Sequence, residues 1–178
     1  MPYIVIVEKK PLYTIGHGSR EAEHFLALLQ AFGIEYLIDV RSQPFSRFHP
    51  QFSQRTLKLF LEENGIRYVF MGDELGGRPK DASCYDSEGR IDYEKVKTKD
   101  YFKKGIDRLK TAYQKDLNVA IMCSERDPAH CHRTKLIAEV LVTDNITVKH
   151  IDETGKIKEH AVVMKEIKKG PETGDLFG

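Results

Sequence analysis

The stretch NVAIMCSERDPAHCHR, residues 118–133, decides the fold class. It opens with an apolar run and turns polar at Ser124. A run without alternating polar residues is typical of a strand that is covered on both faces, as in a parallel sheet. The stretch therefore predicts a buried parallel strand over 118–123, followed by a polar loop and a helix near 132–143.

Other segments repeat this order of strand and helix. Strands are expected at YLIDV (36–40), IRYVFM (66–71) and ITVKHID (146–152), with another helix near 99–115. LYTIGHGSR (12–20) is expected to be a short strand that runs into a glycine turn. Strands that alternate with helices build an open sheet through right-handed crossovers. We predict a single-domain three-layer α/β/α sandwich with a mostly parallel, Rossmann-like sheet. The domain is expected over residues 1–160, with an N-terminal edge strand or hairpin at 3–10 and a polar C-terminal tail over 161–178.

Composition excludes several classes of protein. The 178 residues carry a net charge of +1, and 31% of them are charged while 40% are hydrophobic. These proportions argue against disorder and against a coat of positive charge that binds nucleic acid non-specifically. No apolar run approaches the roughly 18 residues of a membrane span, and the first residues do not read as a signal peptide. Three cysteines are an odd number for a disulfide framework, so we expect a cytoplasmic protein.

Polar and charged side chains gather where the predicted strands end. The first strand leads into Gly16, His17 and Ser19, the second into Asp39 and Arg41, and the strand at 118–123 into Cys123 and Glu125. The carboxyl ends of parallel strands meet at one edge of the sheet, where open α/β sheets bind ligands. The strand exits therefore predict a functional site at that edge.

Cys123 is the candidate nucleophile of this site. The loop after it ends in Cys131-His132-Arg133 at the start of a helix, where backbone N–H groups and a guanidinium favour anions and thiolates. The alternative is that Cys123 is a small buried residue at a strand end, as free cysteines often are. Cys131, His132 and Arg133 are expected to bind substrate. A transition metal at Cys123, Cys131 and His132 stays open, although their spacing matches no familiar zinc motif, and no metal is predicted.

Asp39, Glu125 and His17 are the candidates for acid–base catalysis. Both carboxylates leave apolar strands, so burial would raise their pKa while a nearby arginine would lower it. The alternative for Asp39 is a local ion pair with Arg41. The turn from Gly16 to Ser19 is expected to help hold an anionic substrate.

Two connections are longer than the usual loop of an α/β unit, over residues 41–52 and 72–97. The first mixes Arg41 and Arg47 with phenylalanines, a combination that suits phosphates and stacked bases. In the second, Arg78 follows a pair of glycines and is expected to close over an anion. Cys84 in the same connection is expected to be exposed and without a role.

Five ordered blocks resemble the domain-of-unknown-function 488 family: TIGHGSR (14–20), DVRSQPFSRFHPQF (39–52), LGGRP (75–79), GRIDYE (89–94) and MCSERDPAHCHR (122–133). The resemblance spans residues 12–152. It implies one α/β domain and a shared site at the carboxyl edge of the sheet, and it implies no particular activity.

These observations favour an enzyme, a hydrolase or group transferase, that acts on a phosphate-bearing nucleotide or nucleic acid. Two alternatives stay open. One is a non-catalytic module that binds nucleotides or nucleic acid, and the other is a cysteine-dependent phosphatase or sulfurtransferase that uses Cys123. No G-x-G-x-x-G follows a strand, so a nicotinamide or flavin cofactor is not expected. The ending ETGDLFG (172–178) is loosely similar to tails that bind the sliding clamp of DNA replication.

Overall fold

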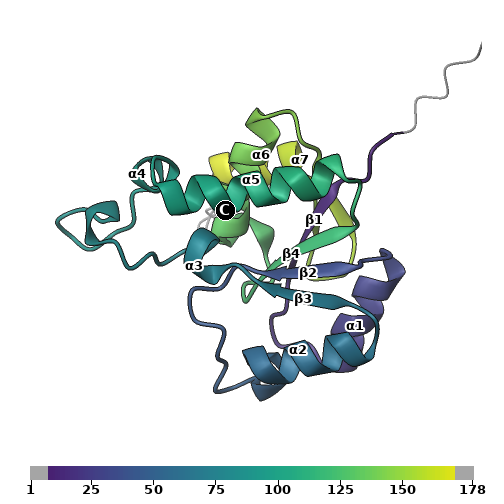
Figure 1. Ribbon diagram of the computed structural model, residues 1–178. Helices are drawn as coiled ribbons and strands as arrows, with labels where there is room; N and C mark the ends of the chain where they lie inside the picture. Colours follow the sequence, from purple (N-terminus) through teal and green to yellow (C-terminus); the bar gives the residue numbers. More distant parts are fainter. Residues whose placement is uncertain (1–7, 171–178) are drawn as a thin grey trace, which may run out of the picture.

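The computed structural model describes residues 8–170 and shows one sheet with helices on both faces (Figure 1). Within these residues the sheet has six strands in the order β3-β2-β4-β1-β5-β6. The strands are β1 (Leu12–Gly16), β2 (Tyr36–Asp39), β3 (Arg67–Phe70), β4 (Val119–Cys123), β5 (Val148–Ile151) and β6 (Ile157–Glu159). The first five are parallel, and β6 runs antiparallel to β5.

The longer helices form two layers (Figure 1). One layer holds α1 (Ala22–Ala31) and α2 (Gln54–Glu63), and the other holds α5 (Asp100–Gln114), the π-helix η4 (Arg133–Ala138) that continues into α6 (Glu139–Thr143), and α7 (His160–Lys169). The predicted three-layer α/β/α sandwich with a mostly parallel sheet is therefore confirmed.

Each face of the sheet has its own hydrophobic core, because neighbouring residues of a strand point to opposite faces. Leu37 belongs to the same core as Phe25 of α1 and Leu61 of α2, whereas Ile38 belongs to the core that contains Phe102 of α5. Both strand residues are buried, as expected for a sheet that is covered on both sides. The absence of polar alternation in the sequence is a direct consequence of this packing.

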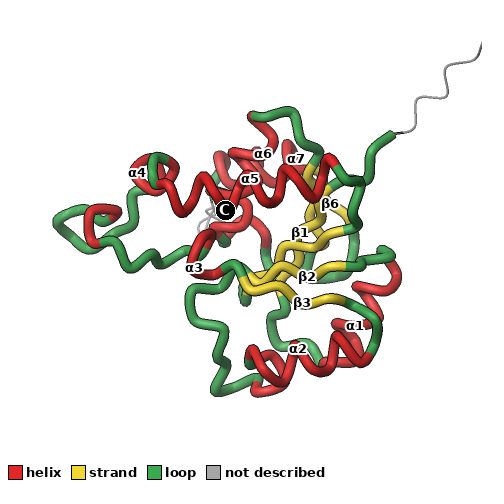
Figure 2. Tube along the Cα trace, viewed as in Figure 1, coloured by secondary structure: helices red, strands yellow, loops and turns green. Residues whose placement is uncertain are grey.

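The connection over 72–97 contains three short helical segments. It contains α3 (Gly72–Leu75), the 3-10 helix η2 (Ala82–Cys84) and α4 (Tyr93–Lys97), which Figure 2 shows as short helical turns within one excursion. Asp81 caps η2 through Ser83 N, and Asp92 caps α4 through Glu94 N. Aspartate accepts the free N–H groups at a helix start, so these two residues order the segment.

Cys84 is a correction to the sequence analysis. We expected an exposed thiol, but the side chain is fully buried and its Sγ lies 3.5 Å from the hydroxyl of Tyr101. The turn η2 folds Cys84 into the core that α5 forms with the sheet. The polar residues around it in sequence are carried on the outer side of this turn.

The calls made for the two ends of the chain fall partly outside the described residues. The predicted N-terminal edge strand or hairpin at 3–10 falls mostly on residues 1–7, which lie outside the described residues; the antiparallel edge strand is β6. The expected tail at 161–178 begins within α7, whose Val163 is buried, and the clamp-like ending at 172–178 lies outside the described residues. No helix in residues 8–170 combines the length and the apolar character that crossing a bilayer requires.

Candidate functional site

A cavity of about 520 Å³ opens at the carboxyl edge of the sheet. The exits of β1, β2 and β4 supply His17, Arg41 and Cys123 to its wall, and the start of η4 supplies Cys131 and His132. Its other lining residues are Ser42, Gln43, Phe45, Ser46, Gly77, Arg78, Tyr93, Ser124, Glu125 and His130. The cavity thus lies where the parallel sheet brings the strand exits together.

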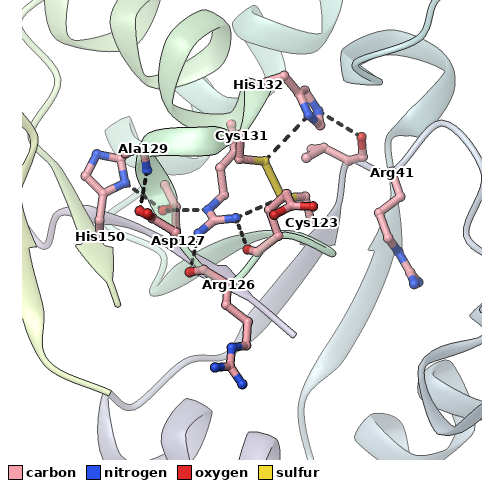
Figure 3. The surroundings of a disulfide bond; sticks show 12 residues. Arg41, Cys123, Arg126, Asp127, Ala129, Cys131, His132 and His150 are labelled. Atoms are coloured by element: carbon pink, nitrogen blue, oxygen red, sulfur yellow. Dashed lines mark hydrogen bonds between the residues drawn. A yellow bond between two sulfur atoms is a disulfide. The ribbon is translucent and has the colours of Figure 1, made fainter. Parts of the chain in front are cut away.

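A disulfide bond joins Cys123 and Cys131 in the wall of this cavity (Figure 3). Their side chains are 2% and 3% exposed, and their Cα atoms are 7.6 Å apart. Cys123 ends β4, where it is the register partner of Gly16 in β1. The loop over 124–130 returns the chain to the strand end, and this return places Cys131 beside Cys123.

Arg133 lies beneath the disulfide and is fully buried. Its Nη1 donates to Cys123 Sγ over 2.8 Å and to the carbonyl oxygen of Glu125 over 2.5 Å, and its Nη2 donates to the carbonyl of Arg126. Burial lowers the pKa of Arg133 to about 9, so the guanidinium stays charged at neutral pH. In the described part of the chain no carboxylate is hydrogen-bonded to it, so the Cys123 sulfur is the contact that can carry a negative charge.

His132 stands on the other side of the disulfide with a fixed tautomer. Its Nε2 lies 3.2 Å from the carbonyl oxygen of Val40, an acceptor, so Nε2 carries the proton and donates it. With the proton on Nε2, Nδ1 is the acceptor of the ring, and it lies 3.7 Å from Cys131 Sγ. Burial lowers the pKa of His132 to about 4, so the ring is a neutral acceptor that can receive the S–H of a reduced Cys131.

Asp39 and Arg41 form a buried ion pair at the end of β2. Arg41 donates from Nη2 to Asp39 Oδ2 over 2.6 Å and from Nε to Oδ1 over 2.9 Å, and its backbone N–H also reaches Oδ1. The hydroxyl of Tyr68 donates to Oδ2 over 2.5 Å. Both carboxylate oxygens of Asp39 are therefore occupied, and their effect is to fix the guanidinium of Arg41 at the cavity wall.

His17 lies next to Arg41 at the cavity wall. Arg41 Nη1 lies 3.3 Å from His17 Nε2, and His17 Nδ1 lies 2.8 Å from the carbonyl of Gly18. A guanidinium only donates, so Nε2 accepts and Nδ1 carries the proton. The ring stacks on Phe52, and burial is the main reason why its pKa falls to about 4. His17 is thus held neutral at neutral pH.

The family model described as "Domain of unknown function DUF488" matches residues 21–141. The match covers well over half of the 178 residues. The chain belongs to the DUF488 family. The comparison with curated proteins finds no match, and the comparison with solved structures finds none either. The matched residues include Asp39, Cys123 and Arg133 of the candidate site, whereas β1 and His17, which follows it, precede the matched range.

The remaining predicted site residues differ in whether they line the cavity. Arg78 is exposed, lines the cavity and donates its backbone N–H to Ser42 Oγ over 2.8 Å. Glu125 is an exposed lining residue. Ser19 and Arg47 are also exposed, but neither belongs to the lining of the cavity within the described residues, and Ser19 Oγ accepts from Arg126 instead.

Gly16 serves the site through its lack of a side chain. A Cβ built on Gly16 would meet the backbone carbonyl oxygen of Glu125 at 1.7 Å, which no side chain tolerates. The loop after β4 can therefore pass directly over the end of β1. This close passage aims the carbonyl of Glu125 at Arg133.

Several residues that shape the DUF488 site were missed at the sequence level. Tyr68 orients Asp39, and Tyr93 lines the cavity with aromatic surface. Thr14 accepts from Arg133 Nε over 3.2 Å in the middle of β1. A signal for Thr14 was present, because it is a polar residue in an otherwise apolar strand; the tyrosines carried none.

Within residues 8–170, Cys123, Cys131 and His132 form a group of side chains that could hold a metal ion, since their ligand atoms lie within 4.8 Å of one another. Sulfur and imidazole nitrogen are the donors that zinc prefers. In the structure the two sulfurs are bonded to each other, so they do not act as thiolate ligands in this state. The arrangement itself favours chemistry on sulfur.

Proposed function

We propose that this protein is a thiol-dependent group-transfer enzyme that exchanges thiols and disulfides with a small anionic substrate, with Cys123 as its nucleophile. The observation that carries the proposal is the disulfide in the cavity wall, one sulfur of which accepts a hydrogen bond from the buried guanidinium of Arg133. A cation beside a cysteine favours the thiolate, which is the nucleophilic form. Arg133 therefore distinguishes Cys123 from Cys131.

The reaction balances with two cysteines. The Cys123 thiolate of the reduced enzyme attacks one sulfur of a substrate disulfide R–S–S–R′, forms Cys123–S–S–R and releases R′–S⁻. Cys131 then attacks Cys123 Sγ and breaks the Cys123–S–R bond, while its proton passes through His132 Nδ1 to the leaving sulfur, which departs as R–SH. The substrate gains two electrons and the enzyme keeps the Cys123–Cys131 disulfide, which two equivalents of a small thiol reduce again.

An anionic substrate is supported by the lining of the cavity. Arg41 and Arg78 face it together with the hydroxyls of Ser42 and Ser124. Guanidinium groups bind carboxylates and phosphates through paired hydrogen bonds. The adjacent Phe45 is 75% exposed, so it offers a flat surface to an apolar or aromatic part of the same molecule.

Hydrolysis or group transfer by general acid–base catalysis with Asp39 has less support. Asp39 is fully buried, and four donors already occupy its oxygens. A general base needs a free lone pair within reach of its substrate. We therefore assign Asp39 the role of holding Arg41 and leave catalysis to sulfur.

A second candidate function is the binding of a nucleotide or nucleic acid without chemistry. The observation in its favour is that Phe45 and Phe48 are 75% and 87% exposed and flank Arg47 in one loop. Exposed aromatic rings beside arginines suit stacked bases and phosphates. This candidate predicts that the loop residues matter for binding and that both cysteines can be replaced without loss of affinity.

Stopped-flow mixing of the reduced protein with three disulfides tests the first proposal: the dicarboxylate dithiobis-nitrobenzoate, uncharged hydroxyethyl disulfide and cationic cystamine. We expect the rate, relative to that of a free thiol with each reagent, to be about tenfold higher for the dicarboxylate. Cys123→Ser should abolish the fast phase. Cys131→Ser should stop at a mixed disulfide on Cys123, visible as a mass increase.

Cys84→Ser is the matched control, since it removes a buried cysteine outside the cavity. It should exchange at the wild-type rate. A Cys123→Ser variant that retains the fast phase, or equal relative rates with all three disulfides, would overturn the proposal. Affinity for an oligonucleotide that survives replacement of both cysteines would favour the second candidate.

A further inference from the structure

Arg133 is the first member of a chain of hydrogen bonds that runs away from the cavity to the protein surface. Its Nε lies 3.2 Å from Thr14 Oγ1, which lies 2.7 Å from His150 Nδ1. His150 Nε2 lies 3.0 Å from His160 Nδ1, and His160 Nε2 lies 3.0 Å from Glu139 Oε2. The chain connects the cavity side of the sheet to a partly exposed carboxylate. Figure 3 shows His150, a member of this chain, to the left of Cys123.

The fold sets each link in place. Thr14 and His150 are register partners in the parallel strands β1 and β5. His160 begins α7 and Glu139 begins α6. All of these side chains except Glu139 are buried, with Thr14 and His150 at 0% exposure. Such burial means that an unmade hydrogen bond in the chain would be costly.

The direction of the bonds follows from the guanidinium end. Arg133 Nε can only donate, so Thr14 Oγ1 accepts there. In the described residues the Thr14 hydroxyl has one other partner, His150 Nδ1, and its proton is satisfied by donating to that nitrogen. Nδ1 of His150 is then an acceptor and its Nε2 carries the proton. Burial lowers the pKa of His150 to about 3, which keeps the ring neutral.

The direction is the same when it is followed from the carboxylate end. Glu139 Oε2 accepts, so His160 Nε2 donates, and in the neutral form of the ring Nδ1 is then the acceptor. That acceptor matches the Nε2 proton of His150. Both ends therefore require the same tautomers, and every donor in the chain points from Arg133 toward Glu139.

We propose that Thr14, His150, His160 and Glu139 are positioning residues for the nucleophile, because their chain of hydrogen bonds holds the Arg133 guanidinium with Nη1 against Cys123 Sγ. This inference rests on the proposed function for its catalytic meaning. The one-way chain fixes the rotation of the guanidinium plane through Nε, and the aligned donors carry the influence of the Glu139 carboxylate inward. Loss of a link should loosen Arg133 and weaken its hold on the sulfur.

Other charged groups around Arg133 also affect its charge. Glu125 and Asp127 of the loop after β4 favour its charge, while Arg20 opposes it. On the disulfide side, His132 and Cys131 are the titratable neighbours of Cys123. None of these residues is altered by substitution at Thr14, so a change there reports on the chain alone.

The test is the pH dependence of Cys123 alkylation by iodoacetamide in a Cys131→Ser background, with the modified site identified by mass spectrometry. Thr14→Val keeps the shape of the side chain and removes the hydroxyl. We expect the midpoint for Cys123, which is the pH at which alkylation reaches half its maximal rate, to rise by about one pH unit. Thr14→Ser restores a hydroxyl at the same place and should return the midpoint toward that of the background protein.

Thr134→Val is the matched control. Thr134 is also fully buried and adjoins Arg133, but its Oγ1 has no hydrogen-bond partner in the described residues. Its midpoint should equal that of the background protein. Equal midpoints for Thr14→Val and Thr134→Val would overturn the proposal. If Thr14→Val does not fold, Glu139→Gln is used instead, where a smaller rise is expected and an unchanged midpoint overturns the inference.

Failure of this inference can be distinguished from failure of the proposed function. Alkylation needs no substrate, so the two proposals are tested separately. If the protein exchanges disulfides but Thr14→Val leaves the alkylation midpoint unchanged, the proposed function stands and the positioning role of the chain is overturned. If Thr14→Val shifts the midpoint but the protein exchanges with none of the three disulfides, the positioning role stands and the proposed function is overturned. The tautomers add an independent check, because ¹⁵N spectra should show the Nε2–H form for both His150 and His160.

Discussion

Replacement of Asp39 by asparagine should destabilise the protein strongly. The carboxylate is 0% exposed and accepts from Tyr68 and from three N–H groups of Arg41, which is itself only 7% exposed. Asparagine has the same shape, but it removes the charge and turns one acceptor into a donor that faces other donors. Breaking one side of a buried ion pair costs about 3–5 kcal/mol of unfolding free energy.

Urea unfolding followed by circular dichroism measures this loss. Asp73→Asn is the control, since Asp73 and its partner Lys80 are 75% and 95% exposed and their closest charged atoms are 3.7 Å apart. An exposed pair of this kind contributes less than about 0.5 kcal/mol. A loss below about 1 kcal/mol for Asp39→Asn would refute the reasoning. It would return Asp39 to the catalytic role that its position at a strand exit first indicated.

Three further predictions concern stability and packing. The unfolding free energy should fall as the pH drops from about 6.5 toward 4, because the unfolded chain binds protons that the folded chain excludes. Each buried histidine with a lowered pKa should contribute up to about 1.4 kcal/mol per pH unit. Measuring the unfolding free energy across this pH range tests the prediction for His17, His132 and His150. Gly16→Ala should cost about 3 kcal/mol, since its Cβ would meet the Glu125 carbonyl, whereas Gly89→Ala has open space and should cost about 1 kcal/mol for its positive φ. Cys84 should resist alkylation in the native protein and react in urea, because it is fully buried; rapid native labelling would contradict its placement.

The architecture was predictable because it rests on local patterns. An apolar run such as VAIM identifies a buried strand, and glycines and charged residues separate the units of the chain. The order of strands in the sheet was not predictable in this way, since the pairing of β4 between β2 and β1 joins residues that are far apart in the sequence. The turn that buries Cys84 depends on the cap at Asp81, a pattern that was present in the sequence but was not used.

The site was predictable in place and less so in detail. Parallel strands carried His17, Arg41 and Cys123 to one edge, as expected from their positions at strand exits. The disulfide depends on the path of the loop over 124–130, which no local pattern specifies. We predicted from the sequence that Arg133 binds substrate. In the structure Arg133 is buried against Cys123, and Arg41 and Arg78 line the cavity.

The two buried arginines differ in how their charge is balanced, and this difference bears on the state of the sulfur. Arg41 has its own carboxylate in Asp39 and therefore needs nothing from a substrate to be stable. Arg133 is bonded to carbonyl oxygens, a hydroxyl and Cys123 Sγ, and its chain reaches a carboxylate only at Glu139. A neutral disulfide leaves this buried charge without an anion in contact, and a Cys123 thiolate supplies one. In the reduced protein the buried charge of Arg133 is thus balanced by an anion in contact. Under the proposed function the disulfide should therefore be readily reduced, and Cys123 should be the thiolate of the pair.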